Sequence, residues 1–163
     1  MKALTIWQPW ASLIMIGAKP VEFRSCDYSA TRMYRDLVGK RIVIHAGGRS
    51  IKPAEIDDLL ARCKSDDRPS LIVEKALPLL ERIRAAWKCQ GVVELSAGLG
   101  TVVIGKPKRV DALFKKPDSD RLYQHMYGWP LSDIQQWPEP MKIGGSQGFW
   151  DWPSVPRQVR KAG

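Results

Sequence analysis

Residues 17–24 constrain the fold more than any other stretch of this sequence. They follow an apolar run, 11–16, which predicts the body of a short helix. Gly17 predicts the end of that helix, because glycine adopts a positive φ without a Cβ clash. Pro20 disfavours helical backbone at the residue before it and lacks a backbone donor, so the chain must continue in an extended form. A strand over Val21–Arg24 is therefore expected directly after the helix.

The same stretch predicts a cluster of three charges. Alternate side chains of a strand share one face, so Glu22 and Arg24 point the same way and Val21 and Phe23 point into a core. Lys19 lies at the turn beside them. A lysine, a glutamate and an arginine are thus expected together on one rim of the sheet.

The length and composition indicate an ordinary globular chain. The sequence has 163 residues, of which 44% are hydrophobic and 26% charged. It predicts one domain over 1–152, followed by a basic tail over 153–163. No apolar run is long enough for a membrane span and no signal peptide is visible, so no membrane association and a cytoplasmic location are expected. Cys26, Cys63 and Cys89 form no CxxC pair, and reduced thiols are expected.

The distribution of charge points towards nucleic acid. The net charge is +9, and the basic excess lies in residues 1–50 and 100–163, whereas residues 51–99 carry eight basic and eight acidic side chains. Six of the seven tryptophans lie in the same two flanking segments. Cations interleaved with aromatic faces suit a polyanion whose bases stack. The alternative, tryptophans in the core and lysines on a solvated surface, is equally compatible with this distribution.

Hydrophobic periodicity predicts more strands than helices in the flanking segments. We expect helices over 8–16, 53–64 and 69–88, the last beginning near Pro78, and short ones ending at 37 and over 118–126. Strands are expected over 2–6, 21–24, 41–45, 92–95, 101–104, 129–134, 141–143 and 149–152, with a loop at 97–100. The predicted fold is α+β: a small β-barrel built from residues 1–50 and about 90–152, flanked by helices, with 51–99 as a helical elaboration.

The sequence lacks the common catalytic signatures, including GxGxxG, the P-loop, GxSxG and HExxH. The two histidines are His45, at the end of a strand, and His125, in a polar segment. No carboxylate–histidine cluster indicates a metal, so neither a metal nor a cofactor is expected. If the protein catalyses a reaction by metal-free acid–base chemistry, the candidate catalytic residues are Lys19 and Glu22.

Three segments together resemble the ASCH family of the PUA-like superfamily. The first is LTIWQPWASLI at 4–14, which runs into Gly17, Lys19, Glu22 and Arg24 in the form GxKxxExR. The second is GKRIVIHA at 39–46. The third combines YGW at 127–129, Lys142 and QGFWDW at 147–152. The order and spacing of the three segments are those of the family.

The resemblance implies a β-barrel flanked by helices, with a basic cleft for RNA or another single-stranded nucleic acid. Lys19, Glu22 and Arg24 match the family motif, and the strand bearing His45 and the Gly-Gly-Ser-Gln turn would line the same cleft. Arg24 and Lys142 would bind phosphates, and aromatic side chains would stack on bases. The expected nucleic-acid-binding residues are Gln8, Trp10, Lys19, Arg24, His45, Tyr127, Trp129, Lys142, Ser146 and Gln147.

Activities in the wider family fall into several classes. Some members resemble plain binding modules, some are reported as ribonucleases acting on single-stranded RNA, and small bacterial members resemble amidohydrolases that deacylate N4-acetylcytidine with a lysine, a threonine and a glutamate. Here Lys19 matches the lysine, but Glu22 holds the place of the threonine. The leading hypothesis is therefore RNA binding with a weak metal-independent ribonuclease activity. The alternatives are an amidohydrolase acting on a modified nucleoside, and a regulatory module that binds a protein partner through 51–99.

Two roles are open for the charge cluster. Lys19 is the better candidate for a general base, because two neighbouring cations oppose a raised pKa at Glu22. In the other reading, Glu22 and Arg24 form a structural ion pair while Lys19 binds phosphate. That reading makes the protein a binding module.

Overall fold

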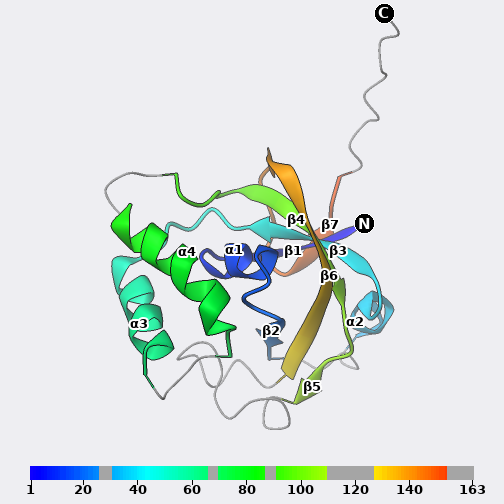
Figure 1. The fold of residues 1–163 in the computed structure, drawn as a ribbon. Helices are drawn as coiled ribbons and strands as arrows, with labels where there is room; N and C mark the ends of the chain where they lie inside the picture. Colours follow the sequence, from blue (N-terminus) through cyan, green and yellow to red (C-terminus); the bar gives the residue numbers. More distant parts are fainter. Residues whose placement is uncertain (26–30, 66–69, 87–90, 110–126, 154–163) are drawn as a thin grey trace, which may run out of the picture.

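The computed structural model describes residues 1–25, 31–65, 70–86, 91–109 and 127–153. Within these ranges the chain forms one sheet and four helices (Figure 1). In chain order the elements are β1 (Lys2–Ile6), α1 (Trp10–Met15), β2 (Val21–Arg24), α2 (Arg32–Leu37), β3 (Arg41–Ala46), α3 (Pro53–Cys63), α4 (Val73–Ala85), β4 (Ala97–Ile104), β5 (Lys108–Arg109), β6 (Tyr127–Lys142) and β7 (Phe149–Asp151).

The seven strands follow the order β2-β6-β4-β3-β1-β7, with β5 paired to β6. β1 and β3 are parallel, and the other pairs are antiparallel. The sheet curls into a half-barrel, so the predicted α+β class with a curved sheet flanked by helices is confirmed at that level. β2 and β7 lie at the two ends of this order, so the curl of the sheet determines how close these two strands come to each other.

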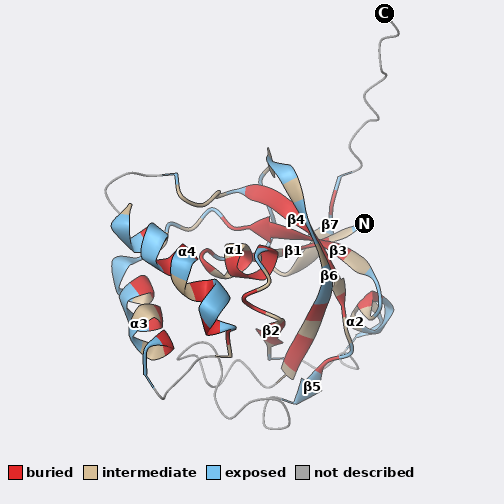
Figure 2. Ribbon diagram, viewed as in Figure 1, coloured by how far each residue is buried: buried red, intermediate tan, exposed pale blue. Residues whose placement is uncertain are grey.

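The central strands are buried on both faces of the sheet. Leu4, Ile42 and Ile44 belong to a core cluster with α1, whereas Val43 packs on the opposite face with Trp152. A second cluster joins α3, α4 and the end of α1. Figure 2 shows buried residues along β1, β3 and β4 and on the facing sides of α3 and α4. Strand alternation therefore assigns a side chain to a face of the sheet, but it does not distinguish interior from surface.

The helices of the middle segment form largely as expected. α3 matches the prediction for 53–64 within one residue. The prediction that the next helix begins near Pro78 is wrong, since α4 begins at Val73 and contains Pro78. Pro78 lies on the exposed side of α4, where the backbone carbonyl that loses its hydrogen bond can bond to water. The apolar stripe that includes Ala76, Leu80 and Ile83 is buried and stabilises the helix through tertiary packing.

Two predictions for 92–100 are wrong. The one for 97–100 is wrong because glycine has a packing role there. Residues 92–95 form no strand, and the predicted loop at 97–100 is the first half of β4. A Cβ at Gly98 would approach the Trp152 ring, with the nearest carbon at 2.5 Å, and a Cβ at Gly100 would overlap the carbonyl oxygen of Gln135. These glycines allow β6 and a tryptophan to come close to β4.

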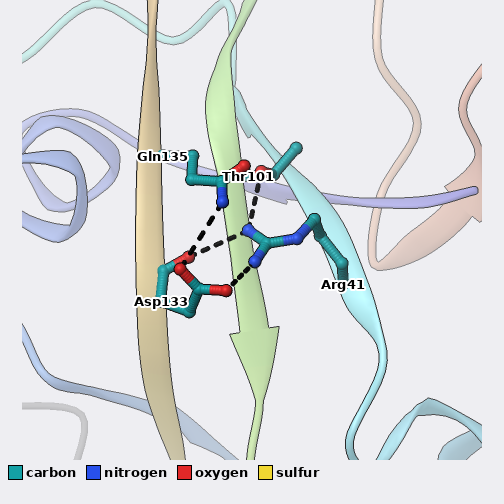
Figure 3. Close-up of polar contacts among 4 residues, drawn as sticks. All are labelled: Arg41, Thr101, Asp133 and Gln135. Atoms are coloured by element: carbon teal, nitrogen blue, oxygen red, sulfur yellow. Dashed lines mark hydrogen bonds and ion pairs between the residues drawn. The ribbon is translucent and has the colours of Figure 1, made fainter.

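The strands predicted at 129–134 and 141–143 form one continuous strand, β6. Its register against β4 shifts near Thr101, and Asp133 has a φ of +46° at that point. Arg41 of β3 reaches across β4: its Nη1 donates to Thr101 Oγ1 at 3.0 Å and to the Asp133 carbonyl at 2.9 Å, and its Nη2 donates to the Asp133 carboxylate (Figure 3). This contact joins three strands where the sheet bends.

β5, at Lys108–Arg109, is a short strand that the sequence did not predict, and the other strands and helices agree with the sequence to within two residues. β1 and β2 have the predicted bounds, β3 extends to Ala46, β7 ends at Asp151, and the first helix is shorter, at Trp10–Met15. The predicted helix at 118–126 and the tail from 154 lie outside the described residues. Cys63 is buried, and the other two cysteines also lie outside. No helix in the described part of the chain is long and apolar enough to cross a membrane.

Candidate functional site

A cleft of about 1140 Å³ lies where the two edges of the curled sheet approach each other. Residues 22–25, on and after β2, line it from one edge, and the loop 145–148 before β7 lines it from the other. The chain between β1 and α1, the turn after β3 and the first turns of α3 complete the wall. The cleft therefore combines segments that are far apart in sequence.

The end of α1 delivers Lys19 into this cleft. Gly17 has a φ of +69°, and its N–H donates to the Ile14 carbonyl at 2.9 Å, while the Ala18 N–H donates to the Leu13 carbonyl at 2.8 Å. This pair of bonds is a Schellman motif, which satisfies the last carbonyls of the helix. The Lys19 N–H also donates to Leu13, at 3.0 Å. The position of Lys19 is thus fixed by backbone bonds, as the sequence predicted for the helix end.

The predicted cluster of three charges forms. Lys19 Nζ lies 3.5 Å from Glu22 Oε2, and Arg24 Nε lies 3.3 Å from Glu22 Oε1. The Lys19 and Glu22 side chains are only 3% and 12% exposed. Lys19 Nζ also lies over the rings of Trp10, at 5.4 Å, and Phe23, at 4.8 Å. Phe23 is buried as expected, and it is also among the residues that line the cleft.

This arrangement presents a fixed acceptor between two donors. Glu22 is held by both cations, and the cluster carries a net charge of +1. Arg24 Nε is buried and has no hydrogen-bond acceptor within the described residues, although it lies near Glu22. The Nε of Arg24 is therefore compensated by the nearby charge of Glu22 rather than by an aligned hydrogen bond.

A second group of side chains on the cleft wall was not predicted from the sequence. The guanidinium carbon of Arg49 lies 4.1 Å from the centroid of the Trp7 ring. Arg49 Nη2 donates to Glu55 Oε1 at 2.7 Å and to Oε2 at 2.9 Å. All three residues line the cleft, and Trp7 is 40% exposed. We call this group the Trp7–Arg49–Glu55 stack.

Glu55 is held in its charged form by its neighbours. Burial alone would raise its pKa. The hydrogen bonds from Arg49 and from the Lys52 backbone N–H lower the pKa by more than burial raises it, so the net pKa is below the usual 4.5. The Lys52 N–H bond, at 3.1 Å, belongs to the capping of α3. The carboxylate therefore fixes both the start of α3 and the position of Arg49.

His45 has a structural position rather than a cleft-lining one. It is 1% exposed, its Nε2 donates to the Ile143 carbonyl at 2.9 Å, and its Nδ1 lies 3.2 Å from Thr5 Oγ1. Trp150 Nε1 donates to the same Thr5 oxygen at 3.0 Å. A Cβ at Gly145 would overlap the His45 ring. His45 thus anchors the loop that carries Ser146 and Gln147 into the cleft.

The other predicted site residues fall into two groups, those that line the cleft and those that do not. Trp10, Lys19, Glu22, Arg24, Ser146 and Gln147 line the cleft together. Gln8 is buried, donates to the Glu94 carbonyl at 2.8 Å and accepts from the Ser12 N–H at 3.1 Å. Trp129 is 2% exposed and packs against Tyr34 and Phe149 in the core. Gln8, His45, Tyr127, Trp129 and Lys142 are not among the residues that line the cleft.

Two of these residues lie on β6. Tyr127 is half-buried and pairs with Arg24 across the sheet. Lys142 lies near the far end of the same strand, where it pairs with Ala97, makes an ion pair with Glu94 and donates to the Leu95 carbonyl at 3.2 Å. They are the first and last residues of this 16-residue strand, so its whole length separates them.

The cleft is not basic among the described residues. Its charged lining consists of three cations, Lys19, Arg24 and Arg49, and three anions, Glu22, Glu55 and Asp58. The prediction of a basic cleft therefore does not describe the lining that the structure provides. The three cations make ion pairs with the carboxylates Glu22 and Glu55 within the cleft.

A second pocket, of about 540 Å³, lies beside α2. Met1, Met33 and Leu37 form its apolar part, and Lys2, Arg32, Lys40 and Arg41 contribute basic groups. Asp36 pairs with Arg32, Asp151 pairs with Lys2, and Asp133 pairs with Arg41. These basic groups are thus largely committed to neighbours. Among the residues that the structure describes, no aromatic side chain lines this pocket, so it has fewer features for ligand recognition than the cleft.

Trp7, Arg49 and Glu55 could not be found from local pattern, because they come from three separate segments. The signals available were a glycine pair before Arg49 and a glutamate three residues after Lys52, which is typical of a helix start. Among the described residues, no three His, Cys, Asp or Glu side chains gather as metal ligands would. No family model matches the chain, and no curated protein matches it.

Proposed function

We propose that this protein binds single-stranded RNA and that its cleft receives an unpaired base above the Lys19–Glu22–Arg24 cluster. The observation that carries the proposal is the carboxylate of Glu22, which is fixed between two cations in a cleft that Trp10 and Phe23 also line. The Watson–Crick edge of an unpaired base offers both donors and acceptors, which Glu22 and Arg24 complement. Trp10 and Phe23 supply apolar faces next to that edge.

The ASCH resemblance supports the same proposal. The matching motif positions Lys19, Glu22 and Arg24 all line the cleft, and a curled sheet flanked by helices agrees with the fold that the resemblance implies. We therefore infer an ASCH domain with a PUA-like barrel. The balanced charge of the cleft favours recognition of a base over recognition of the phosphate backbone, since backbone binding depends on a surplus of cations.

Binding measurements with labelled RNA test the proposal. We expect the protein to bind a single-stranded RNA more tightly than the matching duplex, in the presence of EDTA. Arg24→Met should weaken binding by about 10- to 100-fold, the range for a lost hydrogen bond to a charged group. Arg82→Met on the exposed face of α4 is the matched control, because it removes the same charge away from the cleft. Equal losses in both variants, or tighter binding to duplex, would contradict the proposal.

A second candidate function is hydrolysis of an N4-acylated cytidine. The buried contact between Lys19 and Glu22, at the floor of the cleft, favours it, because a lysine and a carboxylate close together can exchange a proton with a reacting group. Glu22, where the resembling amidohydrolases have a threonine, is the departure that makes this the second candidate. Hydrolysis would add water across the amide, releasing acetate and cytidine.

Product analysis separates the enzymatic alternatives from plain binding. Incubation with N4-acetylcytidine, followed by chromatography, should release cytidine if the second candidate is right, and Lys19→Met should abolish the release. The same protein incubated with end-labelled RNA would give shortened fragments if it is a ribonuclease. Binding without either product leaves RNA binding as the function and removes both enzymatic candidates.

A further inference from the structure

The Trp7–Arg49–Glu55 stack lies on the cleft wall but takes no part in the Lys19–Glu22–Arg24 cluster. No contact between the two groups is needed to hold either of them: the cluster is held by the end of α1 and by β2, and the stack is held by the turn after β3 and by α3. The cleft thus has two separately fixed groups of side chains. The role of the second group needs its own explanation.

Arg49 is oriented by both of its neighbours. The Trp7 ring covers one face of the guanidinium at 4.1 Å, and the two Glu55 oxygens hold one of its terminal nitrogens. Arg49 Nε is buried without a hydrogen bond among the described residues. The side chain is 26% exposed and is among the residues that line the cleft. A flat cation fixed in this way has lost its conformational entropy before a ligand arrives.

The Trp7 ring is held as well. A Cβ at Gly47 would lie 3.0 Å from Trp7 Cδ1, closer than ordinary contacts, so the ring packs directly against the backbone of the turn after β3. The Gly47 N–H donates to the Ile6 carbonyl at 2.9 Å, which fixes that turn to β1. A tryptophan that is 40% exposed is therefore kept in one place at the edge of the cleft.

The charge of Arg49 is already balanced by Glu55, which lowers its attraction for a phosphate. Its flat face is unaffected by that pairing, and guanidinium planes are surfaces on which nucleobases stack. The cleft volume of about 1140 Å³ exceeds the roughly 300–1,000 Å³ that is typical for one small ligand. Chemistry and size together point to a base in addition to the one above Glu22.

We propose that the Trp7–Arg49–Glu55 stack is a subsite for a second base, so that the cleft takes two consecutive nucleotides of a single strand. This inference rests on the proposed function. The first base lies above the Lys19–Glu22–Arg24 cluster, and its neighbour stacks on the guanidinium of Arg49. The ligand class is a single-stranded dinucleotide step rather than an isolated nucleoside.

Binding of short ligands to the intact protein tests the inference. The probes are a mononucleotide, the dinucleotide of the same base, and two dinucleotides in which one or the other residue is abasic, which keeps the phosphate and removes one base. The intact dinucleotide should bind about 10- to 100-fold more tightly than the abasic forms, the range expected for one stacked base. Equal binding of intact and abasic dinucleotides would overturn the second subsite.

Variants distinguish stacking from charge. Arg49→Lys keeps the charge and removes the plane, so it should bind the intact dinucleotide no better than an abasic one, and Trp7→Leu should do the same while Trp7→Phe retains most of the gain. Arg82→Lys is the matched control. Wild-type affinity in Arg49→Lys would mean that Arg49 binds phosphate and would overturn the stacking role. Failure of every probe, longer RNA included, would instead overturn the proposed function itself.

Discussion

Glu22 is the residue on which the charge arrangement of the cleft depends. It lies between Lys19 and Arg24, and its side chain is 12% exposed. Removing one partner of a buried ion pair leaves the other charge poorly compensated, which costs more than the pair contributes in water. The same carboxylate is the acceptor proposed to face the bound base, so its structural and binding roles must be measured separately.

A double-mutant cycle measures the structural role. Glu22→Gln removes the carboxylate charge 3.5 Å from the buried ammonium of Lys19 and should lower the free energy of unfolding by about 3–5 kcal/mol. Lys19→Met in the same chain removes that ammonium as well, so the double variant should be more stable than the sum of the single effects predicts. Urea unfolding of the four proteins gives the coupling. Strict additivity would mean that the ion pair contributes nothing to stability.

The Arg49–Glu55 pair predicts a pH dependence with a definite sign. The pKa of Glu55 is lowered in the folded protein, so the pair contributes stability that is complete above the unfolded pKa of about 4.5 and is lost as the pH falls through the lower folded value. Wild type should therefore melt at a higher temperature than Glu55→Gln at pH 7, and the difference should shrink below about pH 4.5. A difference that grows on acidification would contradict this assignment.

The two groups of the cleft differ in how far the sequence predicts them. Lys19, Glu22 and Arg24 lie within six positions, so a helix end and strand alternation bring them together by local geometry alone. Trp7, Arg49 and Glu55 meet only through the turn after β3 and the packing of α3, which no local pattern encodes. His45 is expected in the cleft because it ends a strand and the resemblance places that strand there, yet packing buries its side chain beneath the loop before β7.

At the scale of the elements, β4 is the strand around which the sheet bends. It pairs with β3 on one side and β6 on the other, and its register against β6 shifts near two of its glycines. Glycine and proline usually interrupt a strand, which is why 97–100 was predicted as a loop and β6 as two strands. Here glycine and proline lie inside strands, because the close approach of neighbouring backbones depends on tertiary packing rather than on local sequence.

Substitution of Gly100 tests this account of β4. A Cβ at Gly100 would overlap the backbone oxygen of Gln135, which cannot move independently of β6. Gly100→Ala should therefore cost about 1–3 kcal/mol of unfolding free energy, as overpacking in a core does. Gly144→Ala is the control, because no atom lies within 4 Å of a Cβ at that position. Thermal melts that show equal effects in the two variants would contradict the packing role.

At the scale of the whole molecule, the net charge of +9 and the balanced charge of the cleft suggest separate contributions to the proposed RNA binding. The cleft lining holds as many carboxylates as cations among the described residues, so much of the basic excess lies elsewhere on the chain. A longer RNA would be attracted by that surface, whereas the cleft would select an unpaired base. The curl of the sheet makes this arrangement, because it brings the edge strand β2 and the loop before β7 to the same cavity.

Photo-crosslinking tests most directly that the cleft is where RNA bases bind. A single-stranded RNA carrying 4-thiouridine is irradiated with the protein, and the modified residues are identified by mass spectrometry. The account predicts adducts on the aromatic residues of the cleft, Trp7, Trp10 and Phe23, and their loss in Arg24→Met but not in Arg82→Met. Adducts confined to the basic surface beside α2, around Arg32 and Lys40, would contradict it.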